Sequence, residues 1–444
     1  MFTNRDLRKL LIPLIIEQVL TSLMGIADTM MVANVGAAAV SGVSLVDSIN
    51  KLVLFLFTAM ATGGTIVCSQ CLGRRDKANS DRAARQVLLS TFALSIIVMA
   101  VCLIFRKGLL RMIFGSVEAD VMAAAEVYFL VTAFSYPFLA LFNAGAALYR
   151  AAGNSRLPML VSVAGNLLNV VGNALLLFVF DLGVAGAAIA TTVSMAATAV
   201  AMLIYLRRPG QAVDVGRYCA IRPDFRTIWL VMRIGLPSGV ENAMFQLGKL
   251  VVQSTVSTLG TTAIASNAIV VVLEYLTSMP SQAIGIGLMT VAGQCIGAGR
   301  LDEAKRNMKK LTLWSTLVLL LTNWFIFFLT RPVCAVSGLD ADAAALTWQV
   351  MLVISIVKPF LWALAFVPAN GMRAAGDVRF GMMTTTVSMW VFRVGLTTVL
   401  CRVLSVGLVG IWCGYFADWL VRSIVFTLRY RSGKWAEKRV IGDG

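Results

Sequence analysis

Twelve apolar runs follow one another along the chain, each about the ~20 residues that a helix needs to cross the hydrocarbon core of a bilayer. They cover residues 9–34, 43–69, 86–106, 120–148, 157–180, 184–206, 228–258, 266–296, 309–330, 343–372, 380–402 and 405–428. With 59% hydrophobic and only 14% charged residues, the 444-residue chain is too apolar for a soluble protein. The sequence therefore predicts an all-α membrane protein with twelve transmembrane helices.

Lysine and arginine lie in short clusters between these runs. If the N-terminus is cytoplasmic, 29 of these residues fall in inner segments and five in outer loops. Inner loops of membrane proteins carry an excess of Lys and Arg, so we expect a multi-pass protein of the plasma membrane with both termini in the cytoplasm. This distribution explains the net charge of +16 without a nucleic-acid partner.

The chain also contains an internal repeat. At a shift of 224 residues, Pro13 falls on Pro237 and Glu17 on Glu241. Gln70, Cys71 and Gly73 likewise fall on the Gln, Cys and last Gly of GQCIG at 293–297. Arg-Ala-Ala-Gly at 150–153 recurs at 373–376. A repeat of this length predicts two structural units of similar fold.

We therefore expect an N-terminal six-helix lobe (1–206), a cytoplasmic linker (207–226), a C-terminal six-helix lobe (227–430) and a basic cytoplasmic tail (431–444). Six helices return the chain to the side where it started, so the lobes are parallel repeats with a pseudo-two-fold axis along the membrane normal. Such architectures commonly work by alternating access, in which a site between the halves opens to one side and then the other.

The first apolar run carries two carboxylates, Glu17 and Asp28. A charged Asp near the bilayer centre costs ~2.5–3.5 kcal/mol on insertion scales, so it marks a function or pairs with another charge. We interpret this run as an ion-handling helix of a secondary transporter. The alternative is that either acid is a packing residue held by a salt bridge.

Several motifs resemble the multidrug and toxic compound extrusion (MATE) family of the MOP superfamily. They are GIADTMMVANVG at 25–36, GVAGAAIATT at 183–192, Gly-Leu-Pro-Ser at 235–238, GQCIGAGRLDEA at 293–304 and the paired Arg-Ala-Ala-Gly motifs. The resemblance implies a secondary active antiporter that exports organic, cationic amphipathic compounds in exchange for H⁺ or Na⁺. It implies no cofactor; the expected partners are small organic substrates and membrane lipid, and the expected state is a monomer.

The resemblance also implies a cation-coupling pocket in the N-terminal lobe. Asp28 matches the family's acid on the first helix. In many relatives the fifth helix adds Asn-x-x-x-Asp; here Asn169 matches the Asn, while Asn173 stands where the Asp would be. Thr191, on the sixth helix, matches a position that lines this pocket in some relatives. The alternative is that the two asparagines only hydrogen-bond across helices.

The missing carboxylate bears on the coupling ion. A pocket with fewer anionic oxygens holds Na⁺ less well, because hard cations need several oxygen ligands. The chain contains no histidine, so a carboxylate removed from water must carry any proton. We therefore favour H⁺ coupling at Asp28, and the only metal we expect is Na⁺ at the same residue.

In the second half, the resemblance points to an acid on the seventh helix. Relatives with such a Glu use it for cations or substrate, often about one turn beyond Glu241, near Gln246. Glu241 and Gln246 are therefore predicted to bind cation or substrate, and Glu17 and Glu274 are predicted to do so as acids within apolar runs. Structural ion pairs are predicted for Asp47 with Lys51, which are spaced i,i+4, and for Lys249 with an acid from another helix.

Other functions have less support. A lipid-linked oligosaccharide flippase of the same superfamily would favour fourteen helices and a strongly cationic cavity. A membrane receptor or scaffold would need an output domain, for which the loops are too short. No nucleophile with a base, phosphate loop or metal cluster indicates an enzyme. Cys68 and Cys71 form a CxxC, but the repeat replaces Cys68 with Ala292, so we read them as packing residues.

Overall fold

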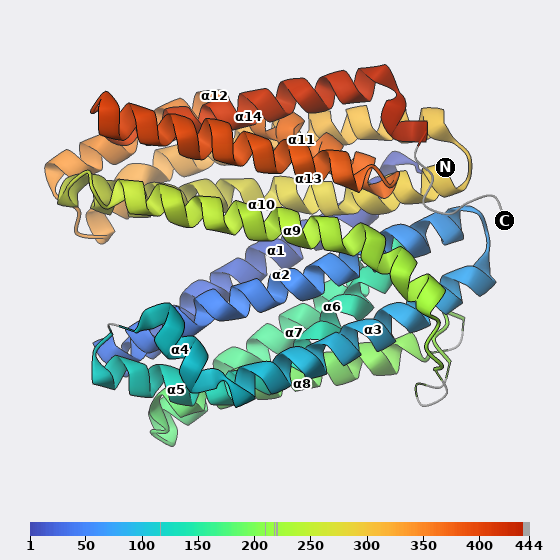
Figure 1. Ribbon diagram of the computed structural model, residues 1–444, viewed down its shortest axis with the longest axis horizontal. Coiled ribbons are helices and arrows are strands. Elements are labelled where there is room, and N and C mark those ends of the chain that lie inside the picture. Colours follow the sequence, from blue (N-terminus) through green and yellow to red (C-terminus); the bar gives the residue numbers. More distant parts are fainter. Residues whose placement is uncertain (116, 209, 217, 219–220, 438–444) are drawn as a thin grey trace. The chain divides into compact units, whose positions relative to one another are not determined.

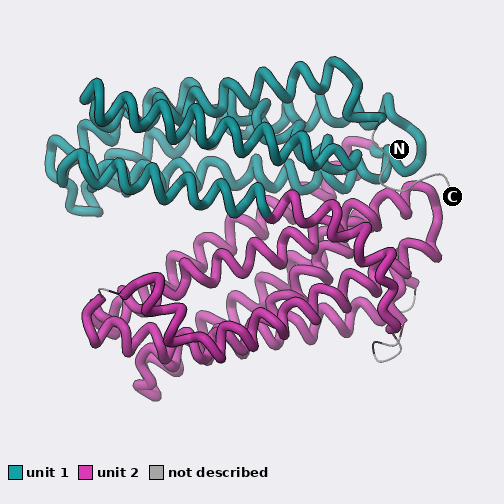
Figure 2. Tube along the Cα trace, viewed as in Figure 1, with its two compact units in different colours: residues 1–2, 240–444 teal, residues 3–239 magenta. Residues whose placement is uncertain are grey.

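The computed structural model describes residues 1–115, 117–208, 210–216, 218 and 221–437, and the predicted tail lies outside these residues from 438 onward. The chain forms two compact units, shown in different colours in Figure 2. We call Thr3–Gly239 the N-terminal unit and Met1–Phe2 with Val240–Gly444 the C-terminal unit. The division falls inside a helix, whereas the sequence repeat places the connecting segment at 207–226.

The N-terminal unit is built from long helices that run side by side (Figure 1). In order they are α1 (Asn4–Ala33), α2 (Ala37–Gly73), α3 (Lys77–Ile104), α4 (Arg106–Phe114), α5 (Ala119–Ala133), α6 (Tyr136–Ala151), α7 (Arg156–Asn173), the π-helical turn η1 (Ala174–Val179), α8 (Gly183–Leu206) and the first part of α9 (Phe225–Val256). α1 packs on α7, and α8 packs on α5, α6 and α7.

The C-terminal unit continues α9 and follows the same plan. Its other helices are α10 (Thr261–Gly297), α11 (Leu301–Val336), α12 (Ala341–Ala374), α13 (Val378–Val387), the π-helical turns η3 (Ser388–Leu396) and η4 (Val399–Val403), α14 (Leu408–Ser432) and the short 3₁₀-helix η5 (Lys434–Glu437). In both units a π-helical segment follows the α-helix that begins after the Arg-Ala-Ala-Gly motif.

Among the described helices, ten are long and apolar enough to cross a membrane, and the bent pair α5 and α6 supplies an eleventh span. The pair is bent by 50° at its break, and Pro137 lies in the first turn of α6, where a missing N–H costs nothing. The sequence had predicted one span here, 120–148. The predicted span 228–258 corresponds to α9, which is 32 residues long, carries Arg233, Glu241 and Lys249, and is not among the helices that meet this criterion. The predicted fold class, an all-α membrane protein, is confirmed.

Local sequence signals explain where several helices begin. α1 starts with a capping box, in which the Thr3 hydroxyl accepts from the Asp6 N–H at 3.2 Å and Asp6 accepts from the Thr3 N–H at 3.0 Å. Gly36 and Gly260 precede α2 and α10 with φ of 136° and 92°, values that favour glycine. These glycines are related by the repeat, so the duplication extends to backbone conformation.

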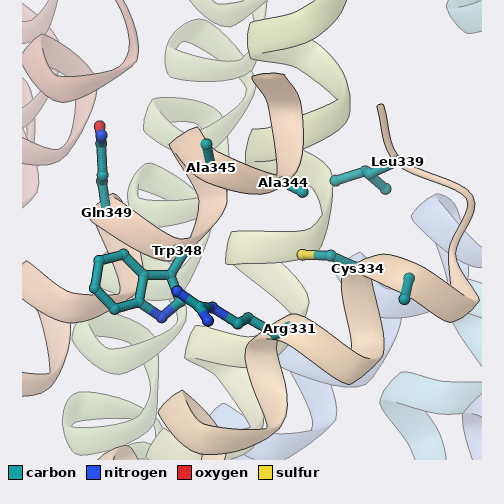
Figure 3. A pocket seen from close by; sticks show the side chains of 8 residues that line it. Arg331, Cys334, Leu339, Ala344, Ala345, Trp348 and Gln349 are labelled. Carbon is teal, nitrogen blue, oxygen red and sulfur yellow. The ribbon is translucent and has the colours of Figure 1, made fainter. Parts of the chain in front are cut away.

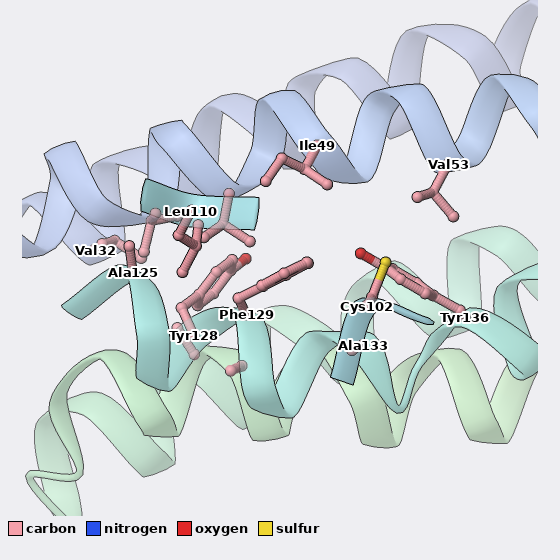
Figure 4. Close-up of a cluster of buried hydrophobic side chains, with 14 of the residues drawn as sticks. Val32, Ile49, Val53, Cys102, Leu110, Ala125, Tyr128, Phe129, Ala133 and Tyr136 are labelled. Atoms are coloured by element: carbon pink, nitrogen blue, oxygen red, sulfur yellow. The ribbon is translucent and has the colours of Figure 1, made fainter. Parts of the chain in front are cut away.

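A hydrophobic cluster holds α2, α5 and α8 of the N-terminal unit together (Figure 4). Ala125 and Phe129 on α5 are fully buried, and the ring of Phe57 on α2 meets that of Tyr136 edge-on with centroids 6.5 Å apart. Tyr128 belongs to the same cluster but has a hydroxyl group at its tip. The cluster therefore fixes α5 so that this hydroxyl is held at a defined place.

In the C-terminal unit, three buried charges meet between η3 and α14. The carboxylate of Asp418 accepts from Arg393 Nη2 at 2.5 Å and from Arg422 Nε at 2.6 Å, and the three side chains are at most 2% exposed. The guanidinium of Arg393 also lies 4.1 Å from the ring centroid of Tyr415. Asp418 therefore compensates two cations that have no access to water.

Replacing this carboxylate should destabilise the protein. We expect Asp418→Asn to lower the free energy of unfolding by about 3–5 kcal/mol, because two buried guanidinium groups would lose their counter-charge. Thermal unfolding of the purified protein in detergent measures the change. Asp342→Asn, at an exposed position on α12, is the matched control and should move the midpoint little. Equal shifts in both variants would contradict the assignment.

A second prediction concerns the close approach of α7 and α8. A Cβ at Gly165 would collide with the methyl group of Thr198, a β-branched side chain with little rotamer freedom in a helix. We expect Gly165→Ala to cost about 1–3 kcal/mol of stability through overpacking. Gly381→Ala, where a Cβ would meet nothing within 4 Å, should be neutral or slightly stabilising. Identical melting points for the two variants would refute this account.

Candidate functional site

Asp28 lies on α1, near the end of the helix at Ala33, and faces α7. Its side chain is half-buried, and its Oδ1 accepts from Asn173 Nδ2 at 2.9 Å. Asn173 is 1% exposed and is the last residue of α7, directly before the π-helical turn η1. π-helical turns inside α-helices frequently occur at functional sites. The structure thus brings together two of the residues that the sequence predicted for one pocket.

Asn169 and Thr191 complete the group. Asn169 is 7% exposed and lies one turn before Asn173 on α7, while Thr191 lies on α8. Beside an ionised Asp28, the Asn169 amide is satisfied in one orientation. With its oxygen toward Thr191 Oγ1 (3.2 Å), its nitrogen donates to Asp28 Oδ1 (2.7 Å) and Oδ2 (3.0 Å). With the nitrogen toward Thr191 Oγ1 (3.2 Å), the oxygen accepts from Asn173 Nδ2 (3.2 Å) but lies against the oxygens of Asp28, an arrangement that only a protonated Asp28 would satisfy.

Two further polar side chains, which the sequence did not assign to this pocket, adjoin it. The Tyr128 hydroxyl faces both Thr191 and Asp47, so it connects the pocket to a second carboxylate. Asp47, on α2, also accepts from Asn50 Nδ2 at 3.4 Å, and Asn50 Oδ1 accepts from the Tyr136 hydroxyl at 2.8 Å. We call Asp28, Asn169, Asn173, Thr191, Tyr128 and Asp47 the N-terminal polar network. The position of Tyr128 among apolar residues gave no signal of this role.

Lys51 is exposed, and the ion pairs of the described residues do not include the predicted one between Asp47 and Lys51. Lys249 lies with its Nζ 4.9 Å from the ring centroid of Phe245, a cation–π contact on its own helix. The structural ion pairs predicted for Asp47, Lys51 and Lys249 therefore remain predictions.

Glu17 and Glu241 occupy equivalent places in the two units. Glu17 accepts from Arg150 Nη2 at 2.6 Å, and Glu241 pairs in the same way with Arg373 Nη2. Both acids are buried, and both arginines belong to the Arg-Ala-Ala-Gly motifs. The repeat copies acid and base alike, and this joint copying was a signal from which the pairs could have been found. As cation or substrate ligands, both acids would have to share their charge with an arginine.

Glu274 is likewise paired, with Lys358 on α12. Lys358 is fully buried; its Nζ lies 2.6 Å from Glu274 Oε1 and donates to Thr277 Oγ1 and Ser278 Oγ, also at 2.6 Å. A buried ammonium group needs such a complete set of acceptors. Gln246, one turn beyond Glu241 on α9, is half-buried. The roles predicted for Glu274 and Gln246 in binding remain predictions.

One cavity of the C-terminal unit, of about 460 Å³, lies where α11 ends and α12 begins. Figure 3 shows Trp348 and Arg331 on its wall, with Cys334 and Leu339 nearby. None of the predicted site residues lines it.

The repeat does not copy Asp28. The shift of 224 residues that relates Glu17 to Glu241 places Asp28 on Val252, which is 3% exposed. The Asp28 pocket therefore has no acidic copy at that position of the second unit.

Comparison with known proteins agrees with this architecture. The family model described as MatE matches residues 13–175 and 237–399, two stretches that begin 224 residues apart, the shift of the internal repeat. The chain is 26% identical over 449 residues to the "Probable multidrug resistance protein NorM" of Thermotoga maritima, covering 99% of this chain and 94% of that protein. It is 23% identical over 440 residues to the "Multidrug resistance protein MdtK" of Pectobacterium atrosepticum, covering 96% and 95%.

Among solved structures, the crystal structure of MATE in complex with MaL6 superimposes with a TM-score of 0.90 at 20% identity, covering 96% of this chain and 95% of that one. At this identity the likeness establishes the fold. The family model establishes more, because it matches well over half of the chain. The chain is a multi-pass membrane protein that belongs to the MatE family of multidrug and toxic compound extrusion transporters, which are not enzymes.

Proposed function

We propose that the protein exports small organic compounds, cationic and amphipathic in character, in exchange for H⁺ that binds at Asp28. The observation that carries this proposal is the surroundings of Asp28. Within the described part of the chain its hydrogen-bond partners are amides, and the ion pairs found there do not include it. An acid placed at membrane depth without a basic partner gains stability by binding a cation or a proton.

The two orientations of Asn169 fit a proton cycle. When Asp28 is ionised, it accepts the Asn169 N–H, and the Asn169 oxygen accepts from Thr191. When Asp28 is protonated, its O–H can donate to the Asn169 oxygen, and the Asn169 nitrogen then faces Thr191 Oγ1. Each protonation state thus has a matching arrangement. Rotation of the Asn169 amide by half a turn would follow each binding of a proton to Asp28, with no large movement of the backbone.

Na⁺ is the alternative coupling ion, and the residues offer a partial fit. The Asn173 Oδ1 is buried and has no hydrogen-bond partner, so it is available to a cation beside the Asp28 carboxylate. Asn169 and Thr191 could add neutral oxygens. The pocket nevertheless contains Asn173 where many relatives carry an acid, and a hard cation is held best by several charged oxygens. This difference favours the proton.

The rest of the proposal concerns direction and substrate. The distribution of Lys and Arg supports a plasma-membrane protein with both termini in the cytoplasm. We propose that the acting unit is a monomer. The names of the relatives, which refer to multidrug resistance, support varied organic substrates. Coupling follows if a proton and a cationic substrate compete for the Asp28 charge, because binding of either one disfavours the other.

Asp28→Asn should abolish coupled export, because Asn can neither bind nor release the proton. Protein reconstituted into vesicles is tested with a fluorescent organic cation, applying a pH gradient and a Na⁺ gradient separately. We expect the pH gradient to drive transport by the wild type, and transport by Asp28→Asn to fall to the level of protein-free vesicles.

Asp120→Asn, the same change at an exposed position of α5, is the control and should keep wild-type transport. A full rate without Asp28 would reject its role in coupling. Transport by the wild type that needs Na⁺ and ignores the pH gradient would reject the proton as the coupling ion.

Asn173→Asp tests the ion preference independently. A second carboxylate beside Asp28 should improve Na⁺ binding, so we expect the ratio of Na⁺-driven to pH-driven transport to rise above that of the wild type. Asn34→Asp adds the same charge at an exposed site just beyond α1 and should leave the ratio unchanged. An unchanged ratio in Asn173→Asp would mean that the missing acid does not set the ion preference.

A further inference from the structure

A basic cavity lies at the N-terminal end of α1, in the N-terminal unit, where the turn between α6 and α7 packs beside it. Its volume is about 920 Å³, and it is lined by residues from the first turns of α1, between 4 and 13, and by the turn at 153–156. We propose that this cavity binds the phosphate-bearing head group of an anionic membrane phospholipid. The proposal does not rest on the transport activity or on the coupling ion.

The charge of the cavity is the first support. Four of its lining residues are cations, Arg5, Arg8, Lys9 and Arg156, and no carboxylate lines it. The nearest acid along α1, Asp6, is held by Thr3, whose hydroxyl donates to Asp6 Oδ2 at 2.6 Å and whose N–H donates at 3.0 Å. Clusters of Lys and Arg at the end of a membrane helix attract anionic lipids.

A buried hydroxyl provides the second support. Ser155 is 1% exposed, lines the cavity, and its Oγ has no hydrogen-bond partner among the described residues. The neighbouring Asn154 Oδ1 accepts from the N–H groups of Arg156 (3.1 Å) and Leu157 (3.4 Å), so the helix start is capped without Ser155. An unpaired buried hydroxyl costs free energy, and a phosphate oxygen would satisfy it. The positive end of the α7 dipole also favours an anion there.

The apolar side of the cavity distinguishes a lipid from free phosphate. Ile12 and Pro13 line it beside the cations. From Ile12 (52% exposed) an uncovered apolar row continues along one face of α1 through Ile16 (41%) and Leu23 (49%), at spacings of four and seven residues. An acyl chain would cover this row while the head group meets the cations. A lipid bound in this way would tie α1, the helix of Asp28, to the turn that precedes α7.

The test compares lipids by native mass spectrometry of the full-length protein released from detergent. Dioleoyl-phosphatidylglycerol is offered beside dioleoyl-phosphatidylcholine, which has the same chains and no net charge. We expect the wild type to retain one phosphatidylglycerol in preference to phosphatidylcholine. Arg8→Gln with Arg156→Gln should weaken that binding tenfold or more, and Ser155→Ala should weaken it to a smaller extent.

The control, Arg306→Gln with Lys309→Gln, removes two exposed charges from the start of α11 and should retain the lipid like the wild type. Melting points of all variants identify any that fail to fold, and Ser155→Ala removes no charge. The proposal is overturned if the two lipids are retained equally, or if the control loses binding as much as the Arg8 and Arg156 variant. Displacement of phosphatidylglycerol by excess inorganic phosphate would also overturn it, since the site would then bind free phosphate.

Discussion

A charged side chain inside a membrane must find a partner, and this requirement organises the interior of both units. Lys358 has Glu274, Asp418 has two arginines, and Glu17 and Glu241 each have the arginine of an Arg-Ala-Ala-Gly motif. Apart from Asp418 and Arg422, which lie one turn apart on α14, these pairs join different helices, so satisfying the charges also fixes the packing. Asp28 differs from these paired acids because the groups around it are neutral amides, and Asp47 of the same network likewise accepts from the amide of Asn50.

The duplication distinguishes residues that recur in both units from residues that are found in one unit. The paired Glu17 and Arg150 recur as Glu241 and Arg373, and Gly36 recurs as Gly260 with a similar backbone conformation. What is duplicated in this way belongs to the scaffold that each unit needs. Asp28, by contrast, falls on Val252, and the π-helical segment of the second unit carries Arg393, which pairs with Asp418. The polar network around Asp28 is thus a property of one unit, which agrees with the coupling role that we propose for Asp28.

The sequence predicted the helices well because span length and hydrophobicity depend on local composition. It placed Asp28, Asn169, Asn173 and Thr191 in one pocket through the family resemblance, and their hydrogen bonds agree with that grouping. It did not place Tyr128 or Asp47 there, because the spacing of Asp47 and Lys51 suggested a local pair. Which way a half-buried side chain turns depends on the neighbouring helix, here α5, and no local pattern contains that information. The bend between α5 and α6 was missed for a similar reason: both halves are equally apolar.

The π-helical turn after Asn173 has a consequence for how this helix can change over evolution. In an α-helix each residue advances the chain by a fixed rotation, so all side chains share one angular alignment. A wider turn absorbs one extra residue and resets that alignment beyond it. The asparagines before η1 and the apolar residues within it are therefore aimed separately. Lengthening or shortening this turn would re-aim the apolar residues from Ala174 onward, while Asn169, Asn173 and the contacts of α7 with α8 would stay in place.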